Sequence, residues 1–463
     1  MKPHILMIAQ YFPPDVAGTS TRVYNAAIGL KNQGCKVTVL TSFPHYPHGK
    51  IPEKYKHKTV SVEEDEGIKV IRTWVPAISH YTFSRRIILH GSFIVSSYFT
   101  GIFRIRDVDL IMSMNPSFFS FFPALMLKQF YGKEIIHNVD DLWPEVWYEL
   151  GIVKSRLFKR ILDWLAGYSY SVSVAVTPIS RSYLQTLTSK YGVSADKIFV
   201  IEHGVDTSRF YHPSNAQKPQ ESLIQPVTEM ERDESMNSEK TKTALNTTEE
   251  PGSAPSMTLS TQATENYQGT KAEAIIMYSG ALSIGYDFEP VIKAAKILEG
   301  RPIKFILRGA GTSTNDIQNL KNMIHQLDVR NIEIRTERLS SEELVAMLGR
   351  ADIFLLPMSF VGFDLGLPTK VLEYQALGKP IVCISNGEAA DYVYRTDSGL
   401  VSRDRDAQKI AELIRRLVED KSLAERLGNN GYDYVQENLT LQKIGERFMN
   451  VIKMKAALSL SMK

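Results

Sequence analysis

Short β-branched runs alternate with amphipathic segments along the first 210 residues of the chain. The runs have the length and composition of buried strands, whereas several of the segments between them have the period of helices. The predicted strands are 4–9, 36–40, 68–74, 110–113, 133–137, 172–177 and 197–201. A strand followed by a helix, repeated, predicts a parallel sheet with helices on both faces.

Residues 211–272 interrupt this pattern. They are rich in Ser, Thr, Glu, Gln, Asn, Lys and Pro, have almost no aromatic residues and show no sustained periodicity. A segment of this composition cannot bury enough apolar surface to offset the entropy lost on ordering. We therefore interpret it as a disordered insertion or linker. A partner-binding or modifiable segment is the alternative.

The alternation resumes after residue 273. The predicted strands are 274–278, 303–307, 332–336, 353–357, 381–384 and 399–401, with helices such as 288–298, 314–327 and 341–350 between them. The tail predicts helices over 407–419, 421–437 and 441–459, with Gly428 and Gly431 as breaks. This pattern is typical of a second doubly wound domain.

The predicted fold class is therefore α/β, with two Rossmann-like doubly wound parallel-sheet domains that face a cleft. We expect an N-terminal domain over 1–210, the polar insertion over 211–272 and a C-terminal domain over 273–440. We expect residues 441–463 to form a helix that packs back on the N-terminal domain. Ligands bind such sheets beyond the carboxyl ends of the strands.

The composition argues against two classes of protein, those that coat nucleic acid and secreted disulfide scaffolds. The 463 residues include 54 Lys and Arg against 51 Asp and Glu, a net charge of +3, which gives no general attraction to nucleic acid. The two cysteines, Cys35 and Cys383, lie far apart in apolar runs, which argues against a disulfide scaffold and favours a reducing compartment. The start of the chain resembles a first strand more than a signal peptide. We expect a cytoplasmic protein.

Two apolar stretches raise the question of membrane contact. Residues 87–103 fall short of a spanning helix because His90 and two glycines interrupt them. Arginines flank this stretch, as in helices that lie on anionic lipid. Residues 118–130 are rich in Phe. Peripheral contact with the inner face of the membrane and ordinary core helices are both compatible with these stretches.

Two predicted helices carry a cation near their start. Gly18 precedes a helix predicted to begin near residue 21, with Arg22 in its first turn, and Lys370 follows Pro368 and Thr369 at the start of another. A cation at a helix N-terminus is unfavourable unless an anion lies beside it. We therefore expect phosphate-binding sites at both helix starts.

Six stretches resemble, in order, the retaining family-four glycosyltransferases of the GT-B fold, in the branch that acts on polysaccharides and lipid-linked sugars. They are ILMIAQYFPPDVAGTSTRVYNAAIGLKNQGCKVTVLTSFPHYPHGK, DDLWPE, KIFVIEHGVD, YSGALSIG, RADIFLLPM and PTKVLEYQALGKPIV. The resemblance implies a hexosyltransferase that uses a nucleoside-diphosphate sugar, most often of UDP. It assigns the nucleotide to the C-terminal domain and a glycan or lipid-linked acceptor to the N-terminal domain.

The resemblance also assigns residues. Donor binding would fall to Gly18, Arg22, Arg308, Pro368, Thr369, Lys370 and Glu373, with Glu373 on the ribose and Thr369 and Lys370 on the diphosphate. Asp141, with Asp140 as the second candidate, and Lys370 would be catalytic, although an Asp pair that caps a helix is the alternative for DDLWPE. His45, Tyr46 and Trp143 would lie on the acceptor side.

No cofactor is expected, and the sequence shows no metal motif, so helix N-termini and cations would carry the charge of the leaving group. The chain departs from the family at three places. Leu365 replaces a glutamate, and the Arg and Lys that the family has just after the strand 274–278 are missing. His203 replaces the asparagine of an NGVD turn. Arg308 could supply one missing cation. We expect His203 to be a packing or hinge residue rather than a base.

Leu365 and the missing Arg and Lys keep one alternative open, a catalytically silent protein that binds nucleotide sugars or partners. A sugar-nucleotide epimerase is a further alternative because it shares the two-domain architecture, although the motifs do not support it. The donor sugar, the nucleotide base, the acceptor, the linkage and the oligomeric state do not follow from the sequence.

Overall fold

The computed structural model describes residues 2–15, 18–46, 49–78, 83–114, 118–149, 151–210, 273–282, 285–309, 311, 314–360 and 366–461. The side chains of Phe83, Phe118, Thr314 and residues 456–461 are outside this description. The predicted insertion at 211–272 and Leu365 also lie outside the described residues. The residues described on both sides of the insertion belong to one compact unit.

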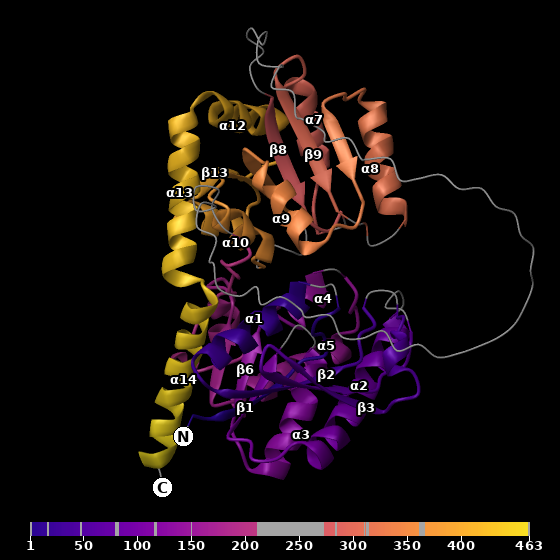
Figure 1. Cartoon of the computed structure of the whole chain (residues 1–463), viewed down its shortest axis with the longest axis vertical. Coiled ribbons are helices and arrows are strands. Elements are labelled where there is room, and N and C mark those ends of the chain that lie inside the picture. The colour runs from indigo at the N-terminus through magenta and orange to yellow at the C-terminus, as the bar shows by residue number, and fades with distance from the viewer. Residues whose placement is uncertain are drawn as a thin grey trace, which may run out of the picture. The chain divides into compact units, whose positions relative to one another are not determined.

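The N-terminal sheet has seven strands in the order β3-β4-β2-β1-β5-β6-β7. It lies in the part of the chain coloured indigo to magenta in Figure 1. The strands are β1 His4–Ile8, β2 Lys36–Ser42, β3 Val60–Asp65, β4 Ile68–Thr73, β5 Leu110–Met114, β6 Ile135–Val139 and β7 Ala175–Pro178. All pair in parallel except β3, which runs antiparallel to β4 at one edge. The sheet is the expected parallel type with one added edge strand.

Helices cover both faces of this sheet. They are α1 Gly18–Asn32, α2 Phe83–Arg104, α3 Phe121–Tyr131, α4 Glu145–Glu149, α5 Arg156–Ser171 and α6 Tyr183–Gln185. Ile5 and Met7 of β1 pack in the same core cluster as residues of α1, whereas Leu6 and Ile8 pack with residues of α2 and α3. Alternate side chains of a strand point to opposite faces, so both faces are buried.

The C-terminal sheet has six parallel strands in the order β10-β9-β8-β11-β12-β13. They are β8 Ala274–Ser279, β9 Ile303–Arg308, β10 Ile332–Arg335, β11 Ile353–Pro357, β12 Ile381–Ile384 and β13 Gly399–Ser402. The helices are α7 Glu289–Ile297, α8 Thr314–Gln326, α9 Ser341–Gly349, α10 Thr369–Ala376, α11 Glu388–Arg395, α12 Ala407–Glu419, α13 Lys421–Asn438 and α14 Leu441–Ser461. Both sheets follow the doubly wound pattern.

Several sequence predictions fail locally. Residues 197–201 form no strand; a single bridge joins Ile198 to Val176. Strand β3 was not predicted. It lies at a sheet edge and contains Glu63 and Glu64, so it lacks the continuous apolar sequence of a buried strand. The helix that holds Arg22 begins at Gly18, not near residue 21, so Arg22 lies one turn inside it.

The predicted breaks at Gly428 and Gly431 are also wrong, because α13 is continuous from Lys421 to Asn438. The two glycines allow close packing instead. A Cβ atom on Gly428 would lie 2.2 Å from the carbonyl oxygen of Gly378, and one on Gly431 would lie 3.0 Å from Gln375 Cγ. The glycines therefore let α13 approach the end of α10.

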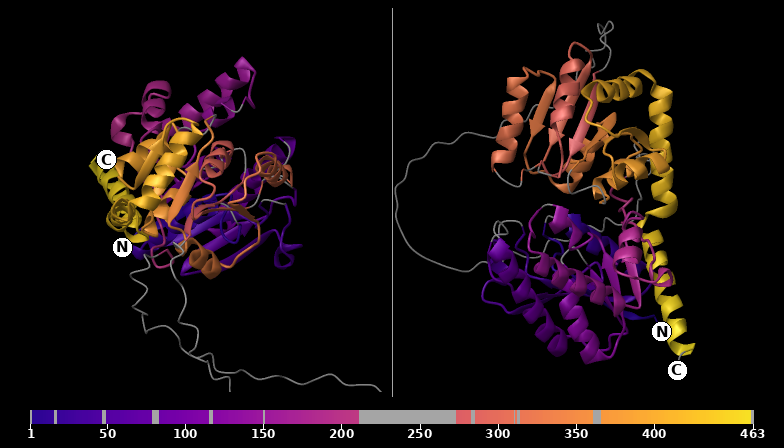
Figure 2. Two further views of the ribbon diagram at one scale, coloured as in Figure 1. Left: turned by 90° about the horizontal axis from the view of Figure 1, so that it is seen from above. Right: turned by 180° about the vertical axis from the view of Figure 1, so that it is seen from behind.

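Helix α14, yellow in Figures 1 and 2, packs on α1 of the N-terminal sheet, whereas α13 packs on α10 of the C-terminal sheet. The crossing of α1 and α14 uses a pair of glycines. A Cβ atom on Gly445 would lie 2.1 Å from the Gly29 carbonyl oxygen, and one on Gly29 would lie 2.6 Å from that of Leu441. The two helix backbones are therefore in direct contact.

The apolar stretches of the sequence have different surroundings. Helix α3 buries Phe121, Ala124 and Leu127 in the core. Helix α2 buries Leu89 and Phe93 but exposes other large apolar side chains, which are Ile87, Ile88, Val95, Phe99 and Phe103. Among the described residues, no helix has the length and apolar character needed to cross a bilayer.

Candidate functional site

Most candidate residues follow the carboxyl ends of strands. In the N-terminal sheet, Asp140 follows β6 and Ser180 follows β7; in the C-terminal sheet, Gly280 follows β8 and Glu388 lies beyond β12. Gly18 at the start of α1 and Thr369 at the start of α10 are neighbours, since a Cβ atom on Gly18 would lie 3.7 Å from Thr369 Oγ1. The expected donor residues of the two sheets therefore meet.

Lys370 lies in a box of tyrosine side chains. Its Nζ atom donates a hydrogen bond to the Tyr278 hydroxyl at 2.9 Å and lies 3.7 Å from the centre of the Tyr286 ring. Burial lowers the pKa of Lys370 to about 7, although the nearby Glu373 carboxylate acts in the opposite direction. An anionic ligand beside a buried amine favours the charged form of the amine and offsets the cost of its burial.

Gly280 makes room for this lysine. Its φ is 155°, and a Cβ atom there would lie 2.4 Å from Lys370 Nζ. The chain turns away from β8 at this position with no side chain, so the amine can lie against the backbone. The glycine of YSGALSIG thus has a steric role in the lysine site.

Glu373 lies one turn after Lys370 on α10 and is half-buried. Burial raises the pKa of Glu373, and the cations Lys370 and Arg209 lower it. Sequence reasoning missed Arg209, which donates a hydrogen bond to the Ser341 hydroxyl of α9 at 2.6 Å. Pro368 lies directly before α10 as its N-cap residue, with φ −66° and an extended ψ of 136°, so it is not part of the first helical turn.

Arg22, Asn138, Asp140 and His203 line one small cavity of about 10 Å³, which is room for about one water. The Arg22 Nε, Asp140 Oδ2 and His203 Nε2 atoms are all buried without a hydrogen-bond partner among the described residues. Buried polar atoms are normally satisfied, and exceptions often mark sites where a water or ligand binds. A polar site therefore lies beside α1.

Asp140 and Asp141 are not a simple helix cap. The Asn138 amide donates to Asp140 Oδ1 at 2.7 Å, and the Tyr183 hydroxyl donates to the Asp140 carbonyl at 3.0 Å. Burial raises the pKa of Asp140 to about 7; the Arg22 charge lowers it and Asp141 raises it. Burial also raises the pKa of Asp141, whereas the charge of Arg22 lowers it. Of the pair, Asp140 is the more buried.

His203 is a buried neutral residue. Burial holds its pKa well below the usual value, and the charge of Arg22 lowers it further. Beside it, the Gly204 carbonyl accepts a hydrogen bond from the Asn25 amide of α1 at 2.8 Å. His203 is therefore packed in the interior, and it lines the small cavity, where its Nε2 atom has no partner among the described residues.

His45 and Tyr46 belong to a loop that Asp15 holds. Asp15 Oδ1 accepts hydrogen bonds from the backbone of His45 at 2.8 Å and of Tyr46 at 2.9 Å, and its Oδ2 is buried without a partner among the described residues. Burial raises the pKa of Asp15 to about 6 and lowers that of His45 to about 4. Asp15 was not predicted; a carboxylate after the Pro pair was the available signal.

Trp143 belongs to an aromatic group beside the aspartates. Its ring centre lies 4.8 Å from that of Trp147, and Phe119 lies 6.2 Å from Trp147 and 4.8 Å from His90. Rings from α2, from the turn before α3 and from α4 and the residues before it therefore collect in one group, which includes Trp143, two residues after Asp141. Sequence reasoning named only Trp143 of this group.

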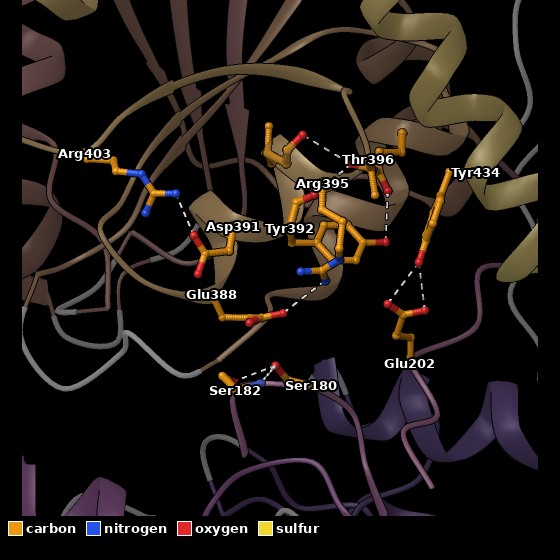
Figure 3. Close-up of polar contacts among 12 residues, drawn as sticks. Ser180, Ser182, Glu202, Glu388, Asp391, Tyr392, Arg395, Thr396, Arg403 and Tyr434 are labelled. Carbon is orange, nitrogen blue, oxygen red and sulfur yellow. Dashed lines mark hydrogen bonds and ion pairs between the residues drawn. The ribbon is translucent and has the colours of Figure 1, made fainter. Parts of the chain in front are cut away.

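Glu388 was also missed. Its buried carboxylate accepts a hydrogen bond from Arg395 at 3.3 Å and faces Ser180 and Ser182 from the N-terminal sheet (Figure 3). Burial raises the pKa of Glu388, and Arg395 and Ser180 lower it. Close by, the Tyr434 hydroxyl lies 3.2 Å from both carboxylate oxygens of Glu202 (Figure 3). Polar contacts thus connect the two sheets here.

Arg308 ends β9 and donates to the Glu337 carbonyl at 3.3 Å, while its buried Nε has no partner among the described residues. Among the described residues, the cations of the candidate site are Arg22, Arg209, Arg308 and Lys370. Within the described ranges, no cluster of three or more His, Cys, Asp or Glu side chains is arranged to hold a metal ion.

Comparisons with known proteins agree with this architecture. Residues 16–209 match the family model described as Glycosyltransferase Family 4, and residues 262–434 match the one described as Glycosyl transferases group 1. A GDP-mannose-dependent monoacylated alpha-(1-6)-phosphatidylinositol monomannoside mannosyltransferase of Corynebacterium glutamicum is 28% identical over 170 residues. That match covers 36% of this chain and 43% of the relative.

Solved structures share the fold across nearly the whole chain. Sucrose-phosphate synthase from Thermosynechococcus elongatus has a TM-score of 0.69 at 16% identity, covering 99% of this chain and all of its own. Anabaena HepE in complex with UDP and glucose has a TM-score of 0.62 at 14% identity, covering 97% of this chain and 99% of its own. By its two family matches and this fold, the chain belongs to the family-four glycosyltransferases of the GT-B fold.

Proposed function

We propose that this protein transfers a sugar from a nucleoside-diphosphate donor to a glycan or lipid-linked acceptor, with retention of the anomeric configuration. The observation that carries the proposal is the partly charged Lys370, buried among tyrosines one turn before Glu373. Burying an amine is costly, and a bound diphosphate would offset that cost.

On this proposal, Lys370 and the start of α10 bind the diphosphate, and Glu373 binds the ribose. Arg22 faces the sugar phosphate from α1, because Gly18 and Thr369 are neighbours. Arg209 and Arg308 supply further positive charge. We propose UDP as the nucleotide. HepE was solved with UDP, but the C. glutamicum relative is named for GDP-mannose, so the two nucleotides need a direct comparison.

The acceptor side would consist of Asp140, Asp141, the His45 and Tyr46 loop and Trp143. In a retaining transfer the acceptor attacks on the face that the diphosphate leaves, and a phosphate oxygen can take the acceptor proton. No strong general base is then required. Asp140 would position the acceptor hydroxyl or stabilise the positive charge that develops on the sugar. Positioning and preorganised charges supply most of the rate gain.

We further propose that no metal ion is required, because Lys370, Arg22 and the N-terminus of α10 can neutralise the departing diphosphate. The exposed apolar side chains of α2, flanked by Arg85, Arg86, Arg104 and Arg106, support contact with an anionic membrane surface. A lipid-linked acceptor would be presented at such a surface.

The test combines nucleotide binding with transfer. Thermal unfolding with UDP, GDP and ADP ranks the nucleotides, and radiolabelled UDP-sugars offered with lipid-linked and oligosaccharide acceptors report transfer. We expect Lys370→Met to lose both nucleotide stabilisation and transfer, while Lys293→Met, which changes an exposed lysine of α7, retains both. Stabilisation by UDP without any sugar transfer would favour the silent binding protein. Release of UDP without an acceptor would favour an epimerase.

A further inference from the structure

An open cavity lies at the edge of the N-terminal sheet, between α2 and strands β3 and β4. Its volume is about 470 Å³, within the range of roughly 300–1,000 Å³ typical of small-molecule pockets. Thr73, Ser96 and Thr100 are among its lining residues, and Trp74, Phe99 and Phe103 surround them. None of these residues was assigned to the donor or acceptor site.

Three large aromatic side chains at this cavity are exposed. Trp74 is 46% exposed, Phe99 53% and Phe103 71%. The apolar surface continues along α2 through Val95 and Ile88, which share a helix face with Phe99 by their spacing. Single exposed apolar residues are common on proteins, whereas large contiguous apolar patches mark sites that bind a ligand, a protein or a membrane.

Three of the hydroxyl groups that line the cavity, those of Thr73, Ser96 and Thr100, form hydrogen bonds within the protein. The Thr73 and Thr100 hydroxyls hydrogen-bond to each other at 2.9 Å, and the Ser96 hydroxyl donates to the Phe93 carbonyl at 3.4 Å. A sugar ring needs polar partners for its hydroxyls, and Thr73 and Thr100 offer little surface to such a ligand because they are only 1% and 6% exposed. The inner part of the cavity therefore suits a hydrocarbon group.

Arg104 adds a charge to this apolar site. It lines the cavity at the end of α2 and is exposed. The structure gives it no ion pair or hydrogen bond with another described residue. A cation beside an apolar cavity is complementary to a ligand that combines a hydrocarbon chain with an anionic group.

We propose that this cavity binds the hydrocarbon chain of an anionic amphiphile, with the chain against Trp74, Phe99 and Phe103 and the anionic group on Arg104. The inference deepens the proposed function and rests on it in one respect: the amphiphile would be the lipid-linked acceptor. Occupation of this cavity would hold the lipid on the N-terminal sheet while its sugar reaches the acceptor side.

Decyl phosphate below its micellar concentration is the probe, with inorganic phosphate and decyl maltoside as the two partial ligands. Calorimetry on the full chain saturated with UDP, which occupies the proposed diphosphate site, should show binding of decyl phosphate, weaker binding of decyl maltoside and none of inorganic phosphate. Arg104→Gln should weaken decyl phosphate binding by about fivefold, since an exposed ion pair contributes modestly. The matched Arg350→Gln, at an exposed arginine after α9, should leave it unchanged.

Ser96→Phe separates cavity binding from adsorption to the surface. It fills the cavity and also adds apolar area, so chain binding should fall by about tenfold or more, whereas adsorption would increase. Ser92→Phe adds the same ring one turn earlier on α2, outside the lining residues, and should bind as the parent does. Equal or tighter binding by Ser96→Phe would overturn the proposal, as would equal affinity for decyl phosphate and inorganic phosphate.

Bromine quenching gives a second measurement that does not depend on the Ser96 variant folding. A brominated decyl phosphate should quench tryptophan fluorescence through Trp74. Trp74→Phe should abolish the quenching, and Trp164→Phe, which removes a 66% exposed tryptophan of α5, should not. Quenching that survives Trp74→Phe overturns the proposal. Because UDP binding and transfer are measured separately, chain binding without transfer would contradict only the proposed function.

Discussion

The Nζ atom of Lys370 lies 3.7 Å from the centre of the Tyr286 ring, and Tyr286 also feels the charge of Arg22. The charge of an arginine of α1 thus acts on a tyrosine that Lys370 contacts. Burial raises the pKa of Tyr286 to about 12, so the ring stays neutral at physiological pH. The ring that faces Lys370 is therefore neutral, and the carboxylate whose charge acts on Lys370 is that of Glu373.

This arrangement predicts that UDP binding weakens as the pH rises above 7. The free protein has a Lys370 pKa of about 7, and a bound diphosphate favours the charged amine, so binding takes up a proton. The dissociation constant should increase with pH above 7, by at most about tenfold per pH unit. Calorimetry between pH 7 and 9 measures this slope.

Lys370→Met is expected to bind UDP weakly with no such slope, and Lys293→Met to behave as the parent. A parent protein whose UDP affinity is constant from pH 7 to 9 would mean that Lys370 does not change its charge on binding.

The sequence predicts most strands of the two sheets because buried parallel strands are continuous apolar runs. It also predicts the start of α10, where Pro368 and Gly378 bracket a short amphipathic segment. Prediction from the sequence fails where close packing between distant segments determines the role of a residue. Gly428 and Gly431 resemble breaks in a helical pattern, and only the Gly378 carbonyl beside Gly428 reveals their role.

The site shows the same division. Lys370, Glu373 and Asp141, with Asp140 as the second candidate, stand out because each is a charged residue in a recognisable motif. The structure draws attention to Asp140, whose carboxylate lines the small cavity. The Tyr278 and Tyr286 box and the cavity shared by Arg22, Asp140 and His203 could not be predicted, since their members come from distant segments. Which side chains converge there depends on how α1, β6 and the chain after β7 pack together.

Asp140→Asn should remove activity and raise stability. Burial raises the pKa of Asp140 to about 7, so the folded protein binds a proton between about pH 4 and 7 that the unfolded chain has released. Folding is therefore penalised increasingly as the pH rises through this range. The neutral asparagine avoids that penalty while transfer falls by about 100-fold or more, a loss typical of preorganised charges at a reacting centre.

Thermal unfolding of Asp140→Asn and the parent at pH 5 and pH 8 provides the measurement. The variant should have the higher unfolding temperature at pH 8, and the difference should shrink at pH 5. Asp352→Asn, at a carboxylate that accepts a hydrogen bond from the Ile275 backbone at 2.8 Å, is a control that should not stabilise the protein. A destabilised Asp140→Asn at pH 8 would mean that the carboxylate is needed for folding.

Removal of divalent metal is expected to leave transfer intact. Lys370, Arg22 and the start of α10 carry the charge of the departing diphosphate in the proposed function, so EDTA should change the initial rate by less than about twofold. The assay is sugar transfer after dialysis against EDTA, with and without added Mg²⁺ or Mn²⁺. Loss of transfer with EDTA and recovery with Mg²⁺ would show that the assigned cations are insufficient.

The contact between Gly29 and Gly445 predicts a strong position-dependent effect of alanine. A Cβ atom on Gly445 would lie 2.1 Å from the Gly29 carbonyl oxygen, so Gly445→Ala must push α14 away from α1. We expect a loss of about 2–3 kcal/mol in the free energy of unfolding, in the range of overpacked cores. Gly91→Ala is the matched control, since a Cβ atom there meets nothing within 4 Å. In the interior of α2 it should instead stabilise the protein by up to about 1 kcal/mol through helix propensity. Chemical denaturation of both variants tests the pair, and equal effects would mean that the α1 and α14 backbones are not in contact in solution.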